Sequence, residues 1–259
     1  MPINQLSSLW DGLSEHLIAS FFVVEPEGDA WSGSWRRSQS ETMEVRAPLS
    51  EANLEITLGW EDPFAASGAG AKAPTLMAML QSGALQPVID AVQGEKGGML
   101  TESGLSDQIS KYYGRTSITK LNSMQIFNAM QPIKINCTAV FRAWRDPVSE
   151  VEEPIDQLLY WAFPQELSKD GSIFARMIQT ARGNMGTTEA LMPSVAPLAI
   201  GMKYKNRTYA PLVIENISLP LSSPVNSEGH FIEQQVQLSL SSLSAIDRTD
   251  WSNTKTLIL

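Results

Sequence analysis

The sequence predicts an α+β protein built on a mainly antiparallel sheet with one flanking helix. Three observations lead to this prediction: several segments alternate apolar with polar residues, one segment has clear helical spacing, and three strand-like runs close the chain. The chain has 259 residues, enough for one large domain or two modest ones with a buried core. Its 43% hydrophobic and 18% charged content is typical of a globular protein.

The first sixty residues are predicted to contain a helix and several strands. Residues 3–19 place leucines and a tryptophan near helical spacing, which predicts a short amphipathic helix. The apolar run 16–24 stops at a Glu-Pro-Glu-Gly turn and predicts a strand. Residues 43–47 and 54–58 each alternate apolar with polar side chains, as strands with one buried face do.

The composition changes after residue 62. Residues 63–119 hold small-residue and glycine-rich stretches with short helix-like runs at 76–80 and 88–92, so we expect an inserted loop or helical segment there. The β framework then consists of residues 1–62 and 120–259. A loop of this length in a compact domain commonly covers a neighbour or binds a partner.

The best-determined strand and helix are predicted in the second half. Residues 133–142 alternate strictly and predict a strand with one apolar face. Ser149 and Glu152 fit a capping box, and residues 155–162 then follow helical spacing until Pro164 ends the helix.

Three strands are expected to close the fold, after a less regular stretch. Residues 173–181 have helical character and residues 183–188 are typical of a loop. The closing strands are expected at 198–204, 212–219 and 231–240, joined by turn-rich segments.

Charge and residue inventory argue against several functional classes. The net charge of −9 and a pI near 4.8 argue against a dominant role in holding nucleic-acid phosphates, which needs a basic face. One cysteine, Cys137, and two histidines, His16 and His230, argue against a disulfide framework and against cysteine- or histidine-rich metal sites. We therefore expect no cofactor and no bound metal. No apolar run is long enough to span a membrane, and the N-terminus lacks the basic region of a signal peptide.

No catalytic template fits the sequence, so we expect no catalytic residue. Neither histidine lies near a G-x-S-x-G motif, and Cys137 falls among inward-facing residues, where its thiol is expected to stay protonated. Glu152, Glu153 and Asp156 cluster at the start of the predicted helix. A hydrolase using these acids is one hypothesis, but acidic side chains are also favoured at the positive end of the helix dipole.

An aromatic–basic run near residue 30 is the main candidate for an interface. Trp31 and Trp35 flank Arg36 and Arg37 in the run WSGSWRR. Such a run fits a protein–protein interface, ordinary core and rim packing, or stacking on sugars or bases. A soluble carbohydrate- or peptidoglycan-binding module, with Trp60 as a third stacking platform, is the alternative function.

The stretch 132–164, PIKINCTAVFRAWRDPVSEVEEPIDQLLYWAFP, resembles the tube-type baseplate proteins of contractile phage tails and related injection systems. In that family an alternating strand, here ending near 141–144, leads into an acidic-capped helix like the one at 152–163. The run PLVIENISLP at 211–220, the turn 226–229 and the strand 234–240 are similar to the family's closing strands. The resemblance covers residues 132–243.

The resemblance implies a split β-barrel, formed by residues 1–62 and 120–259, with one flanking helix. It also implies a non-enzymatic homo-oligomer, a hexameric ring that links the tail tube to the central hub and supports tube assembly. Such a protein is assembled in the host cytoplasm and resides in the virion baseplate. DNA would pass transiently through its lumen without specific binding, which suits the acidic composition because carboxylates repel phosphates.

The resemblance leaves open which strand faces the channel. Two predicted strands have polar faces, and either set is a candidate. These sets are Gln235, Gln237 and Ser239 on one strand, and Lys134, Asn136 and Thr138 on the other.

Overall fold

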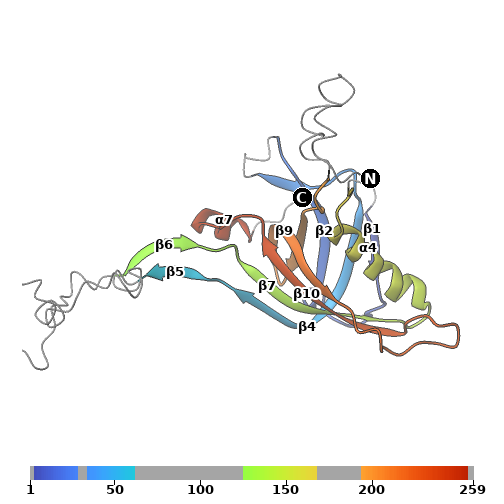
Figure 1. Ribbon diagram of the computed structural model, residues 1–259. Coiled ribbons are helices and arrows are strands. Elements are labelled where there is room, and N and C mark those ends of the chain that lie inside the picture. Colours follow the sequence, from blue (N-terminus) through green and yellow to red (C-terminus); the bar gives the residue numbers. More distant parts are fainter. Residues whose placement is uncertain (1–2, 29–33, 62–124, 168–193, 256–259) are drawn as a thin grey trace, which may run out of the picture. The chain divides into compact units, whose positions relative to one another are not determined.

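The computed structural model describes residues 3–28, 34–61, 125–167 and 194–255 (Figure 1). The chain divides into two compact units, Met1–Thr57 with Met130–Leu259, and Leu58–Ala129. Trp31, the predicted insertion at 63–119 and the predicted helical stretch 173–181 lie outside the described residues.

The larger unit is mostly sheet. Its described residues form one mixed sheet of eight strands with two α-helices, which is compatible with the predicted α+β class. The strands are β1 (Asn4–Ser7), β2 (Ile18–Pro26), β3 (Trp35–Arg37), β4 (Met43–Glu55), β7 (Lys134–Arg142), β8 (Ile200–Tyr204), β9 (Arg207–Ser218) and β10 (Glu233–Ser242). The helical elements are η1 (Glu15–Leu17), η2 (Val148–Glu152), α4 (Glu153–Ala162) and α7 (Arg248–Asn253).

The strand order is β1-β4-β7-β10-β9-β8-β2-β3, and β4 also pairs with β2. The sheet is mixed because β1 runs parallel to β4, whereas the other pairings between its strands are antiparallel. The predicted closing strands are confirmed as β8, β9 and β10. A two-residue turn, in which Lys205 and Asn206 both have positive φ, joins β8 to β9, as tight hairpins favour.

β4 is one long strand that changes partner half way along. Its first half pairs with β1 and β2, and its second half, from Leu49 to Glu55, pairs with β7. A β-bulge between Leu49 and Glu51 marks the change, since a bulge re-aims a strand without ending it. The prediction of separate strands at 43–47 and 54–58 was therefore wrong: β4 continues to Glu55.

The core gathers the inward side chains of the sheet and of the helix. Alternate residues of β7, including Cys137 and Phe141, are buried, as the sequence pattern predicts. They pack with Leu158 and Trp161 of α4, both fully buried. Burying side chains of this size stabilises the fold by about 1.5–3 kcal/mol each.

The predicted helix is confirmed as α4, but its predicted cap was wrong. Ser149 does not cap through Glu152; instead the Asp146 carboxylate accepts hydrogen bonds from the amide (3.2 Å) and hydroxyl (2.6 Å) of Ser149. The buried carboxylate of Glu150 accepts from the backbone N–H groups of three residues, 144–146. The π-helical turn η2 precedes α4 and moves the capping groups one turn earlier.

The N-terminal helix predicted at 3–19 was also wrong. β1 and the short turn η1 occupy this stretch, separated by Gly12 with φ of +87°. β1 pairs with β4 along one side of its backbone, and a glycine in this conformation interrupts a helix. Tertiary pairing thus overrides a weak local helical pattern.

The described part of the second unit is a two-stranded sheet of β5 (Leu58–Glu61) and β6 (Ile126–Met130). Trp60 and Phe127 lie on it with ring centroids 5.2 Å apart, and both are about half exposed. Gly59 lets the two strands approach closely, because a Cβ at this position would lie 2.9 Å from the carbonyl oxygen of Ala129.

Candidate functional site

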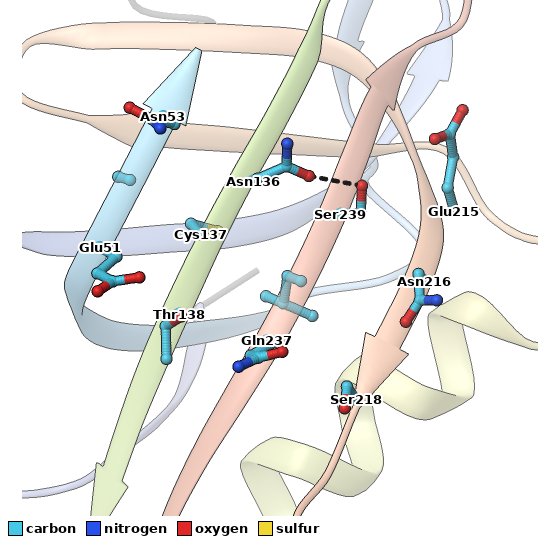
Figure 2. Close-up of a pocket in the computed structure, with 12 residues that line it drawn as sticks. Glu51, Asn53, Asn136, Cys137, Thr138, Glu215, Asn216, Ser218, Gln237 and Ser239 are labelled. Atoms are coloured by element: carbon cyan, nitrogen blue, oxygen red, sulfur yellow. Dashed lines mark hydrogen bonds between the residues drawn. The ribbon is translucent and has the colours of Figure 1, made fainter. Parts of the chain in front are cut away.

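A continuous polar surface covers the outer side of four neighbouring strands, β4, β7, β10 and β9 (Figure 2). We call it the polar face. It comprises Glu51, Asn53, Asn136, Thr138, Glu215, Asn216, Ser218, Gln237 and Ser239. These side chains surround an open hollow of about 1260 Å³.

Strand register arranges the polar face in rows. One row crosses the sheet through Asn53, Asn136, Ser239 and Asn216, which are successive cross-strand partners. The next row, by the same register, contains Glu51, Thr138, Gln237 and Ser218. The rows arise because each strand alternates inward apolar with outward polar residues, and antiparallel pairing aligns the outward ones.

The two candidate strand faces are therefore parts of one surface. The sequence left open which of two strands faces a channel. The candidates were Lys134, Asn136 and Thr138 on one strand, and Gln235, Gln237 and Ser239 on the other. In the structure both sets lie on the same side of the sheet, and the Ser239 hydroxyl donates to the Asn136 side-chain oxygen at 2.8 Å. Gln235 continues the β10 series, exposed and opposite Val140.

Two basic side chains of β7, on the same side of the sheet as the polar face, are paired with acids. Lys134 lies 3.1 Å from Glu215, and Arg142 lies 3.8 Å from Glu233 at the other end of β7. Exposed pairs of this kind contribute only about 0–1 kcal/mol to stability. Their electrostatic consequence is that the positive charges of Lys134 and Arg142 are each offset by a neighbouring carboxylate.

Cys137 lies directly behind the polar face, and its side chain is 4% exposed. Burial raises the pKa of its thiol to about 12, because the thiolate would lose its hydration. The thiol is thus protonated at neutral pH, as the sequence predicted.

Sequence reasoning missed the contributions of β4 and β9 to the polar face. The alternation from Glu51 to Glu55 was a usable signal on β4, but the strand predicted there began only at residue 54. On β9 a bulge opposite Ser239 and Leu240 shifts the register, so that Glu215 and Asn216 both contribute to the hollow. An inserted residue breaks the two-residue period on which the sequence argument depended.

The aromatic–basic run is only partly within the described residues. Trp35, Arg36 and Arg37 form β3, an edge strand next to β2. Arg36 pairs with Glu25 at 3.0 Å. Arg37 pairs with Glu44 at 2.8 Å, and its guanidinium lies over the Phe22 ring. The two arginines thus contact groups of the same chain, and the interface assignment of this run stays a prediction.

The acidic cluster at the helix start is split by the fold. Glu153 and Asp156 are exposed, whereas Glu152 accepts hydrogen bonds from the His230 ring (3.0 Å) and the Phe231 amide (3.2 Å). Glu152 thereby fastens the loop between β9 and β10 to the helix. His16 lies exposed in η1.

No protein-family model matches the chain, and no curated protein matches it significantly. In the part of the chain that the structure describes, no group of three or more acidic, histidine or cysteine side chains is arranged to hold a metal ion. The helices described there are too short or too polar to cross a bilayer.

Proposed function

We propose that this chain is a structural subunit of a contractile phage tail baseplate, which forms a hexameric ring between the tail tube and the hub and supports tube assembly. The sequence resemblance of residues 132–243 suggests the family, and three features of the sheet support the proposal. They are the circuit of strand pairings, two free strand edges, and the chemistry of the polar face.

The circuit of pairings supports a split β-barrel. Starting at β4, pairings run through β7, β10, β9, β8 and β2, and β2 pairs again with β4. A sheet that returns to its first strand has the connectivity of a barrel. β4 belongs to the circuit twice, through its two halves, which is how a split barrel differs from a simple closed one.

The two free edges support ring formation. Residues 50–55 of β4 pair with β7 on one side, and residues 213–218 of β9 pair with β10 on one side. Among the described strands, neither segment has a partner on its other side. We call them the β4 edge and the β9 edge. They bound the four-stranded sheet that carries the polar face.

The strand directions allow the β9 edge of one copy to pair with the β4 edge of the next. Successive pairings from β4 to β9 are all antiparallel, so β4 and β9 run in opposite directions. Joining them head to tail continues an antiparallel sheet through every copy. Cyclic closure leaves neither the β4 edge nor the β9 edge free, which is how assemblies remove the hazard of exposed strands.

The polar face has the chemistry expected of a channel for DNA. Its side chains are amides, hydroxyls and carboxylates, and two basic side chains on the same side of β7, Lys134 and Arg142, are paired with acids. Affinity for DNA comes mainly from unpaired Lys and Arg on phosphates, so a surface of this kind gives a duplex little to bind. The observation that carries the proposal is this surface, which offers no unpaired lysine or arginine among its described residues and is bounded by the β4 edge and the β9 edge.

Electron microscopy of the purified chain, together with sedimentation velocity, tests the proposal. We expect rings with a central channel. Proline at Asn53 or at Leu54 removes one backbone N–H, and neighbouring N–H groups of a strand point to opposite sides. One of the two variants therefore loses an outward donor of the β4 edge, and we expect that variant to keep its circular dichroism but lose rings. Monomers under all conditions would end the proposal.

The carbohydrate-binding alternative is supported by one observation, the half-exposed Trp60 and Phe127 rings of the second unit. Adjacent exposed rings are surfaces on which sugars stack. Glycan-array binding that is lost in Trp60→Ala would favour this function over the structural one.

A further inference from the structure

The two edges that the ring would join carry charge of the same sign. The β4 edge contains Glu51 and Glu55, and the β9 edge contains Glu215. Neither edge contains a lysine or an arginine. Lys134 of β7, on the same side of the sheet, lies 3.1 Å from Glu215. Three carboxylates against one ammonium leave a net charge of −2 on this part of each copy.

The three carboxylates lie on one side of the sheet. Glu51 and Glu55 are cross-strand partners of Thr138 and Lys134, whose side chains belong to the polar side of β7. Glu215 lies at the bulge of β9, contacts Lys134 and lines the same hollow (Figure 2). When the β9 edge of one copy pairs with the β4 edge of the next, Glu215 of the first copy lies on the same side of the joined sheet as Glu51 and Glu55 of the second.

The three carboxylates at this junction are close enough to repel one another. Side chains on adjacent strands are about 5 Å apart when directly opposite, and like charges there oppose pairing. The screening length is about 8 Å at physiological ionic strength and about 30 Å in about 0.01 M salt. Low salt therefore leaves the repulsion nearly unscreened. Both edges also carry a β-bulge, a second device by which natural edge strands resist pairing.

We infer that Glu51, Glu55 and Glu215 form an electrostatic barrier to self-association, so that copies of this chain join edge to edge only when their carboxylates are screened or neutralised. This inference rests on the proposed ring and states what regulates its formation. Copies of the chain remain monomeric at low ionic strength and assemble as the salt concentration rises. A partner that presents cations to these edges acts in the same way as salt.

Sedimentation velocity of the full chain in about 0.01 M and about 0.5 M NaCl tests the barrier. The informative variant is Glu51→Gln with Glu55→Gln, which removes two charges and keeps the side-chain shapes. The matched control is Glu15→Gln with Glu228→Gln, which makes the same change in net charge at exposed positions outside the two edges. Circular dichroism confirms that all three proteins are folded.

The wild-type chain is expected to need about tenfold more protein for half-assembly at the lower salt concentration, which corresponds to about 1.4 kcal/mol. The edge variant is expected to assemble equally well at both concentrations, and the control to behave like the wild type. Salt-independent wild-type assembly, an edge variant with wild-type salt dependence, or a control that matches the edge variant would each overturn the barrier while leaving the ring. Monomers in every sample would overturn the ring itself.

Discussion

Replacing Glu150 with alanine tests whether the turn before α4 is held by one buried carboxylate. The side chain is 6% exposed, and its oxygens accept from the backbone N–H groups of Trp144 at 2.6 Å, Arg145 at 3.2 Å and Asp146 at 3.4 Å. Its backbone carbonyl also accepts from the buried hydroxyl of Ser8. This residue therefore links the end of β7 to the helix and to the segment after β1.

The expected magnitude follows from these three contacts. A hydrogen bond to a charged group contributes about 1.5–3 kcal/mol, and the short bond to Trp144 belongs in that range. The two bonds to Arg145 and Asp146 contribute less, because they are longer, at 3.2 and 3.4 Å. We expect Glu150→Ala to lower the free energy of unfolding by about 3 kcal/mol and the melting temperature by about 6–12 °C.

Urea and thermal denaturation followed by circular dichroism measure this loss. Glu150→Gln keeps the side-chain shape and one acceptor oxygen, so about half the loss is expected. Glu153→Ala is the matched control, since Glu153 is exposed in the first turn of α4 and contributes below about 1 kcal/mol through the helix dipole. Equal losses for Glu150→Ala and Glu153→Ala would refute the reasoning.

Two further predictions concern the core. Gly201→Ala is expected to destabilise the fold by about 1–3 kcal/mol, because the added Cβ would lie 2.6 Å from Cε2 of Phe22. Urea denaturation measures this loss, and an unchanged midpoint would contradict the close contact between Gly201 and Phe22. Cys137, whose thiol has a pKa of about 12, is expected to resist thiol reagents at pH 8 until the chain unfolds; equal labelling rates for native and denatured protein would show that it is accessible.

The sequence predicted the elements whose local pattern and tertiary environment agree. β7 and α4 have strict two-residue and near-helical periods, and each buries the face that its pattern assigns. The polar sides of β7 and β10 were identified for the same reason. Their union into one surface was not predictable, because register between strands far apart in the chain is set by the whole sheet.

Two of the features that sequence reasoning missed depend on partners distant in sequence, and a third depends on a local π-helical turn. β1 forms where leucine spacing favoured a helix, because its backbone pairs with β4. The cap of α4 comes from Asp146 and Glu150 rather than from Ser149 and Glu152, because a π-helical turn precedes the helix. Glu152 was free to bond a loop that lies 78 residues away along the chain.

Chemical cross-linking between the two edges tests the central claim, self-association through paired strands, most directly. Asn53 and Asn216 are in the same row, three strand spacings or about 14 Å apart within one copy, but on adjacent strands where two copies join. With both replaced by cysteine, a maleimide linker shorter than that span is expected to give a ladder of linked chains ending at the hexamer. A gel that shows only unlinked single chains, at salt and protein concentrations high enough for assembly, would contradict the claim.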